Sequence, residues 1–269
     1  IAGLAFSLAL APFHLWFPPA LEATPWPVVA LMAGVAPLAL LSASARLVFV
    51  AFGDLNDMWQ PVLAALGLFS VAVGAIAGLA TERVSHLFAA FATIGAGFGV
   101  MALSAGNVAG VAAMLAFMAL QGAAMLGLIA FAALVEKDGR AVENLRDLNG
   151  YAATQMSRAF AVLVILLSAA AIPPLAGFVV RLSILQAMHD SGMIWQSLAG
   201  VGAMVLAGFA FLRPAWRLYV TTEPAEVETR PARLRDAIVT GSAAVAVLGL
   251  LSLGGMEAVI EAAAARLER

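Results

Sequence analysis

Two proline-containing breaks interrupt long apolar segments of this chain of 269 residues. The first break contains Pro12 and His14, and the second contains Pro173, Pro174 and Gly177. An unpaired backbone N–H or C=O is costly in lipid, so a broken helix survives only where other helices bury it or water reaches it. Paired discontinuous helices are typical of transporter sites near the bilayer midplane. The pattern therefore predicts a membrane protein involved in transport.

Composition agrees with a membrane-spanning chain and excludes several other classes of protein. Hydrophobic residues make up 63% of the sequence and charged residues 11%, and several apolar runs exceed about eighteen residues. A formal net charge of −2 without a basic run argues against nucleic acid as a partner. The chain has no cysteine, which excludes disulfides and thiolate-bound iron–sulfur or zinc centres. The three histidines lack metal-site spacing, and we expect no metal.

The apolar pattern predicts an all-α fold with about eight membrane segments, two of them discontinuous. The expected segments are 1–17 with its break, 27–52, 59–79, 86–104, 108–135, 158–188 with its break, 194–220 and 237–253. Residues 136–155 are expected to form a polar connector with room for a short amphipathic helix. The end of the chain, 256–269, is expected to form a surface helix.

Successive loops lie on alternate surfaces of the membrane, so each charged loop residue can be assigned to one surface. One surface receives most of the basic residues: Arg83, Lys137, Arg140, Arg146, Arg158, Arg217, Arg230, Arg233 and Arg235. The other surface receives Arg46, Arg266 and Arg269, together with Asp54, Asp57 and Asp190. By the positive-inside rule the first surface is cytoplasmic, and the C-terminus then lies outside.

Short motifs around the two breaks carry a family resemblance. They are the run 6–16 with the sequence FSLALAPFHLW, Pro25-x-Pro27-Val28, Arg46-Leu47, Asp147-Leu148-Asn149-Gly150, and the run from Leu167-Ser168 to Gly177-Phe178. Together they resemble the antiporter-like membrane subunits of respiratory complex I, most closely the N-type. The M and L types and the D-type subunits of Mrp antiporters are relatives of this family.

The resemblance implies the second half of a fold of two inverted five-helix repeats. Residues 1–52 would be the end of the first repeat, 53–220 the second repeat, and 221–269 a cytoplasmic connector, a last transmembrane helix and an amphipathic tail. Because Ile1 lies in a helix already under way, with no signal peptide, we expect a longer parent chain.

The resemblance also implies a function and a set of partners. The expected function is that of a proton-translocating membrane subunit of an NADH:quinone oxidoreductase-type complex in a bacterial inner membrane. Its partners would be other membrane subunits and the lipid bilayer. This chain alone is expected to bind no cofactor, neither NADH nor flavin nor quinone.

The lysines that carry protons in this family are missing here. The resemblance places them at Ser7, Pro37 and Arg181, whereas Lys137, in a loop, is the one lysine of the sequence. Ser7 and Pro37 cannot carry a proton charge, and arginine keeps its proton at physiological pH. Arg181 is therefore expected to be either a fixed charge in a hydrated half-channel or a link between helices through backbone carbonyls at the break.

For each of the other polar residues the sequence leaves two possible roles. His14 could relay protons, because imidazole titrates near neutral pH, or it could satisfy carbonyls freed by the break. Gln121 either organises water or joins helices. Glu22 either pairs with His14 or faces water, and Pro37 is expected to kink its helix.

Three functions are compatible with these residues. The chain is a proton-translocating subunit with Arg181 as its central charge and His14 and Gln121 as relay, a non-conducting scaffold of the same complex, or part of an Mrp-type cation/proton antiporter. An independent carrier for a small solute would need polar groups at the breaks, where only Ser7, Arg181 and Ser183 are available.

Overall fold

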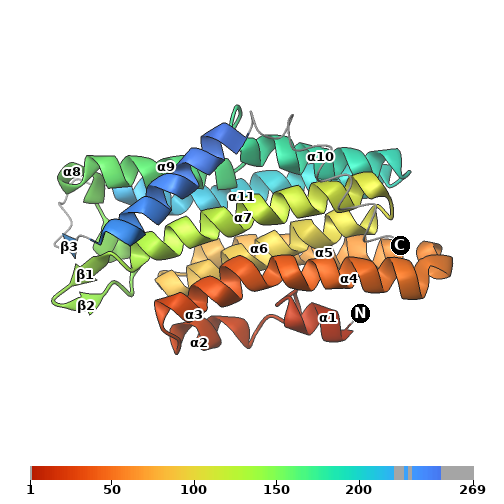
Figure 1. The fold of residues 1–269 in the computed structure, drawn as a ribbon, viewed down its shortest axis with the longest axis horizontal. Coiled ribbons are helices and arrows are strands. Elements are labelled where there is room, and N and C mark those ends of the chain that lie inside the picture. Colours follow the sequence, from red (N-terminus) through yellow and green to blue (C-terminus); the bar gives the residue numbers. More distant parts are fainter. Residues whose placement is uncertain (1, 221–226, 230–231, 250–269) are drawn as a thin grey trace.

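The computed structural model describes residues 2–220, 227–229 and 232–249. Most helices run along one long axis and form an elongated bundle (Figure 1). In chain order the elements are α1 (Ala2–Ser7), α2 (Phe17–Glu22), α3 (Trp26–Ala30), η1 (Leu31–Val35), α4 (Ala36–Phe52), η2 (Gly53–Leu55), α5 (Asn56–Ala80), α6 (Val84–Ser104), α7 (Val108–Ala132), β1 (Val135–Lys137), β2 (Arg140–Ala141), η3 (Leu145–Leu148), α8 (Tyr151–Thr154), α9 (Met156–Ala169), α10 (Ala176–Asp190), α11 (Ile194–Val220) and β3 (Glu228–Thr229). A further helix covers 233–249. The predicted helical class is confirmed.

Five helices are long and apolar enough to cross a membrane. They are Trp26–Phe52, Asn56–Ala80, Val84–Ser104, Val108–Ala132 and Ile194–Val220. Each overlaps a segment expected from the sequence. The remaining expected segments are shorter helices in the described part of the chain, so the total of about eight spans stays a prediction.

The first of these spans contains a wide turn beside Pro37. It is built from α3, the π-helical turn η1 and α4, with Pro37 in the first turn of α4. Proline has no N–H to give to the preceding turn, so the backbone widens locally before it. The irregularity lies where the sequence predicts a kink.

Helix α6 is the centre of the bundle, and its residues 87–104 are all buried. Glycines let α5 approach it closely. A Cβ on Gly67 would lie 2.7 Å from the carbonyl oxygen of Gly97, and one on Gly74 would lie 2.9 Å from Ile94 Cγ1. Small residues favour helix association in lipid, where no hydrophobic effect drives it. Both broken helices contact α6. In Figure 1, α2 lies below α6 and α10 lies above it.

Both predicted discontinuous helices are present. In the second, α9 and α10 are separated by residues 170–175, around Pro173 and Pro174. In the first, α1 and α2 are separated by 8–16, and α2 continues to Glu22, beyond the predicted end at Phe17. Prolines at the start of α2 explain the difference, because the first helical turn needs no N–H donors.

The connector after α7 contains more than the predicted short helix. Strands β1 and β2 form a hairpin, and β3 from the chain after α11 pairs with β1, so the sheet order is β2-β1-β3. Helix α8 supplies the expected short helix. It holds the buried Tyr151, whose hydroxyl oxygen lies 3.2 Å from Thr229 Oγ1. Burial raises the pKa of the Tyr151 phenol, which extends the range over which the phenol stays neutral to higher pH.

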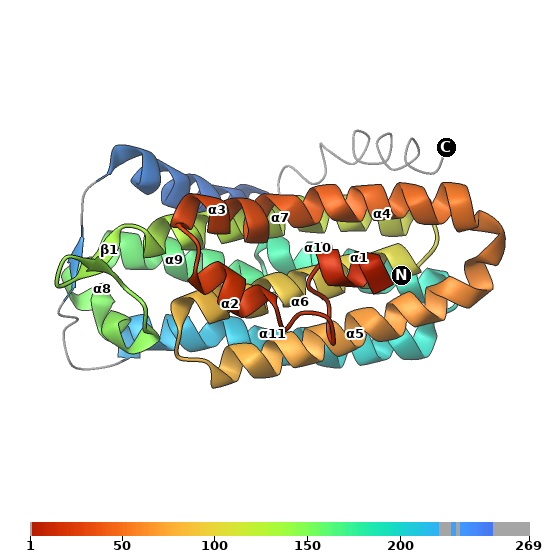
Figure 2. The same ribbon diagram turned by 90° about the horizontal axis from the view of Figure 1, so that it is seen from below.

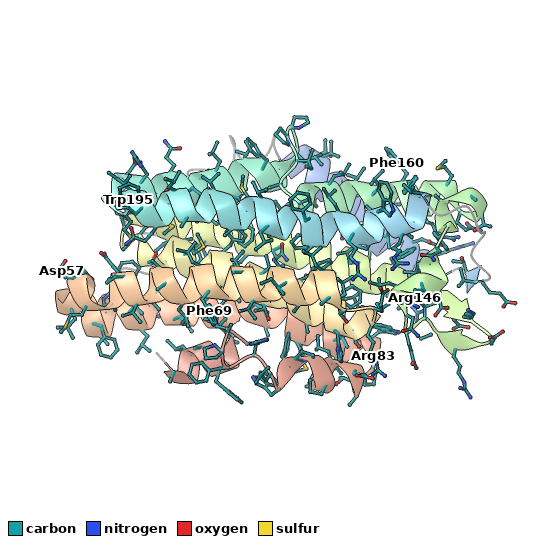
Figure 3. All side chains as sticks on the ribbon, turned by 180° about the vertical axis from the view of Figure 1, so that it is seen from behind. Asp57, Phe69, Arg83, Arg146, Phe160 and Trp195 are labelled. Atoms are coloured by element: carbon teal, nitrogen blue, oxygen red, sulfur yellow. The ribbon has the colours of Figure 1, made fainter. Side chains whose placement is uncertain are left out.

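Charged side chains gather at one end of the bundle, as the sorting of loops predicts. Figure 3 shows Arg83 and Arg146 at this end and Asp57 and Trp195 at the other. Glu22 pairs here with Arg83 and, at 2.9 Å, with His86 Nε2, rather than with His14. The discontinuous helix is therefore tied to the start of α6.

The helix 233–249 lies obliquely across the bundle near α9 and α7 (Figure 1). Its first turn is held by Arg158 of α9, whose Nε lies 2.8 Å from Asp236 Oδ1, and by Arg235, which donates to the carbonyl of Ala133. Arg230, the end of the last predicted segment (250–253) and the predicted surface helix 256–269 lie outside the described residues.

Candidate functional site

The second break is closed by a contact that only glycine permits. Gly177, in the first turn of α10, donates its N–H to Ser168 Oγ at 3.1 Å. A Cβ on Gly177 would lie 1.8 Å from the carbonyl oxygen of Ser168. The end of α9 and the start of α10 are therefore in direct backbone contact, and Pro173 and Pro174 lie exposed in the loop between them.

Arg181, one turn after Gly177 on α10, is the central charged residue of this site. Only 1% of its surface is exposed. Its Nη1 donates to the carbonyl oxygen of Ala169, the last residue of α9. A helix C-terminus leaves carbonyls without partners, and a cation near it is favourable. Arg181 thus joins the two halves of the broken helix.

Aromatic rings from three helices surround the guanidinium of Arg181. Its Cζ lies 4.9 Å from the ring centroid of Phe98 on α6, 5.4 Å from that of Phe117 on α7 and 5.6 Å from that of Phe211 on α11. The negative ring faces attract a cation, most strongly where water is excluded. Nε and Nη2 of Arg181 have no hydrogen-bond partner among the described residues. These contacts are those of a link between helices rather than of a charge in open water.

Gln121 lies one helical turn after Phe117 on α7, so it is near the ring cluster around Arg181. It is 6% exposed, and its Nε2 donates to the carbonyl oxygen of Phe91 at 3.4 Å. A Cβ on Gly95 of α6 would lie 3.0 Å from Gln121 Cγ. Gln121 therefore packs α7 against α6, in agreement with the helix-joining role.

Two backbone groups at the first break form hydrogen bonds with side-chain hydroxyls that the sequence did not identify as site residues. Ser70 Oγ on α5 accepts the N–H of Ala11 at 3.0 Å, and Thr93 Oγ1 on α6 donates to the carbonyl of Ala9 at 3.1 Å. Unpaired backbone groups in lipid cost several kcal/mol each, so these bonds make the break tolerable. Lone hydroxyls in apolar helices carry no sequence signal that separates such a role from ordinary packing.

The remaining predicted site residues do not meet Arg181. His14 is half-buried and belongs to the break between α1 and α2 (Figure 2). Helices α1 and α2 lie below α6 in Figure 1, whereas α10 lies above it. Ser7 is exposed and donates to the carbonyl of Gly3 at 3.0 Å. Pro12 belongs to the same break, and Pro37 is a buried residue of α4. Gln121 and Arg181 are thus connected through helix α7, which carries both Gln121 and Phe117, whereas His14 belongs to the other break.

Metal binding finds no support in this part of the chain. Among the described residues no group of three or more histidine, aspartate or glutamate side chains is placed to hold a metal ion.

Similarity to known proteins agrees with this architecture. Residues 1–207 match the family model described as "NADH:quinone oxidoreductase/Mrp antiporter, TM". The chain is 36% identical to NADH-quinone oxidoreductase subunit N of Rhodobacter capsulatus, over 99% of this chain and 56% of that protein. It is 38% identical to subunit N of Jannaschia sp. (strain CCS1), over 81% of this chain and 45% of that one.

Solved structures of two kinds of complex contain the same fold. A chain of respiratory complex I from Thermus thermophilus is 26% identical, with a TM-score of 0.71 over 97% of this chain and 56% of its own length. A chain of the Mrp complex from Dietzia sp. DQ12-45-1b has a TM-score of 0.80 at 21% identity, over 98% of this chain and 57% of its own length. The chain spans about half the length of the proteins it matches. The fold is therefore that of a multi-pass integral membrane protein.

Proposed function

Because the chain belongs to the NADH:quinone oxidoreductase/Mrp antiporter transmembrane family, we propose that it is an antiporter-like membrane subunit of an NADH:quinone oxidoreductase-type complex. We further propose that the half described here holds a fixed charge and passes no protons. Similarity to proteins named subunit N supports the first part of the proposal. The second part rests on Arg181.

The observation that carries the proposal is the set of buried polar side chains. Among the described residues Arg181 is the one member of that set that is charged at neutral pH, and the others are serines, a threonine, Gln121 and the phenol of Tyr151. A proton relay needs groups that gain and lose a proton near neutral pH, which arginine does not do. Serine and proline occupy two further positions, Ser7 and Pro37, at which the family carries lysine. A non-conducting scaffold role for this half therefore fits better than a proton path.

Replacement of Arg181 by lysine tests this proposal. Wild-type and Arg181→Lys full-length subunits are reconstituted separately into vesicles, and proton flux under an imposed pH gradient is followed with an internal pH dye. We expect the same flux from both proteins, because the side chains that surround Arg181 are phenylalanine rings, which carry no titratable proton. A protonophore added at the end verifies that the vesicles are sealed. Flux that Arg181→Lys raises above the wild-type rate contradicts the proposal.

The first part of the proposal, the parent complex, can be measured separately. Purification of the tagged full-length protein in mild detergent, followed by mass spectrometry, is expected to recover iron–sulfur and other membrane-arm subunits in stoichiometric amounts. Recovery of Mrp-type partners would instead assign the chain to a cation/proton antiporter, a function for which the Dietzia structure supports only the fold. Recovery of no partner would favour an independent carrier.

The position in the membrane and the division into repeats follow from the same proposal. We place the charged end on the cytoplasmic side of a bacterial inner membrane, which puts the C-terminus outside. We assign 1–52 to the end of the first repeat, 53–220 to the second repeat and 221–269 to the connector, last helix and tail. Packing of α5 against α11, the expected first and last helices of the second repeat, supports this division.

A further inference from the structure

Three arginines surround one carboxylate at the charged end of the bundle. Arg213 Nη2 lies 2.6 Å and Arg217 Nη2 lies 3.0 Å from Glu82 Oε1, and Arg146 Nε lies 3.8 Å from Glu82 Oε2. We call these four residues the arginine cluster. Guanidinium groups keep their charge at all physiological pH values, so three positive charges face one negative charge and the cluster has a formal excess of two positive charges.

The members of the arginine cluster differ in how far they reach into solvent. The side chain of Arg213 is 19% exposed, and it also donates to the carbonyls of Gly78 and Thr81, so it fastens α11 to the end of α5. The side chain of Arg217 is 24% exposed. Arg146, in η3, is 70% exposed, and its distance to Glu82 exceeds that of a hydrogen bond. Arg146 is therefore the member best placed to meet a ligand.

An apolar surface extends along helices α5 and α11 and ends at the arginine cluster. Helices α5 and α11 lie side by side and turn large apolar side chains outward (Figure 3). The exposed side chains of this face are Phe69 and Ile76 on α5, and Leu198, Val205, Phe209 and Trp216 on α11. Trp216, 64% exposed, directly precedes Arg217, and tryptophan favours the depth of the lipid headgroups. The cluster thus stands at the level of the headgroups of lipids that cover this face.

We propose that the α5–α11 face and the arginine cluster bind an anionic phospholipid. The acyl chains lie along the apolar side chains, and the phosphate accepts hydrogen bonds from Arg146, the most exposed member of the cluster. Basic groups at the ends of transmembrane helices recognise anionic head groups, and the planar guanidinium matches phosphate oxygens in pairs. Charge complementarity selects this occupant, because the excess positive charge of the cluster is matched by an anionic head group and not by a zwitterionic one.

Native mass spectrometry of the full-length protein in mild detergent tests the proposal, with phosphatidylglycerol and phosphatidylcholine added at equal concentrations. The wild type is expected to retain phosphatidylglycerol preferentially. Arg146→Gln removes one exposed charge and is expected to bind phosphatidylglycerol about fivefold more weakly, with phosphatidylcholine binding unchanged. Arg140→Gln, on the exposed strand β2, removes the same charge outside the cluster and is expected to bind like the wild type.

Several outcomes would overturn the proposal. Equal effects of Arg146→Gln and Arg140→Gln would mean that only the overall charge of this end matters. Displacement of the lipid by inorganic phosphate at the same concentration would mean a site for free phosphate instead. A protein subunit cross-linked to Phe209 or Trp216 within the purified complex would mean that a partner covers the face. Size-exclusion profiles and unfolding temperatures of both variants verify that they remain folded.

Discussion

Replacing Gly177 by alanine is expected to prevent stable folding of the second broken helix. The new methyl group would lie 1.8 Å from the carbonyl oxygen of Ser168, far inside van der Waals contact. The obstacle is backbone and not a flexible side chain, so α9 and α10 must separate. Separation breaks the hydrogen bond from Gly177 N–H to Ser168 Oγ, and it moves Arg181 away from Ala169. Overpacking of this kind costs about 3 kcal/mol or more.

The measurement is the yield of monodisperse protein and its unfolding temperature in mild detergent. Gly202→Ala is the matched control, because a Cβ at Gly202 on α11 meets nothing within 4 Å. Alanine in an open helical position stabilises by up to about 1 kcal/mol. We therefore expect Gly202→Ala to equal or exceed the wild type and Gly177→Ala to fall well below it. Equal stability of the two variants would contradict the close backbone contact in the structure.

The backbone breaks could be predicted from the sequence because their cause is local. Proline lacks an N–H and restricts the residue before it, so Pro12 and the pair Pro173 and Pro174 mark the interruptions wherever the rest of the chain goes. The long apolar spans follow for the same reason from hydrophobicity and length. The predicted end of the first broken helix at Phe17 is wrong, since prolines can start a helix as well as stop one.

Features that join distant parts of the chain could not be predicted. Strand β1 pairs with β3, which is separated from it by β2, η3 and four α-helices, and neither strand is long enough to show a pattern. The rings of Phe98, Phe117 and Phe211 come from three helices, and each is an ordinary apolar residue in its own segment. The sequence leaves both expected roles of Arg181 open, because the difference between them lies in what surrounds the charge.

Substitution of Arg181 by methionine and by alanine is expected to give very different stabilities. Alanine leaves a cavity among the three rings, which costs about 2–5 kcal/mol. It also leaves the carbonyl of Ala169 without its donor, which costs about 1–3 kcal/mol. Neither variant buries a charge in the membrane, so each regains about 2.5–3.5 kcal/mol of stability from that change. Arg181→Ala is therefore expected to be destabilised overall.

Methionine fills most of the volume but removes the charge, its attraction to the three rings, and the donor. The loss of about 1–3 kcal/mol at Ala169 and of about 2 kcal/mol of attraction to the rings is largely offset by the relief of about 2.5–3.5 kcal/mol from no longer burying a charge. We expect Arg181→Met to unfold near the wild-type temperature in detergent and Arg181→Ala well below it. A variant Arg181→Met as unstable as Arg181→Ala would show that the fold itself needs the cation. If Arg181→Met unfolds well above Arg181→Ala, the fold does not require this positive charge. The property that the arginine supplies is then the electrostatic field of its charge inside the membrane.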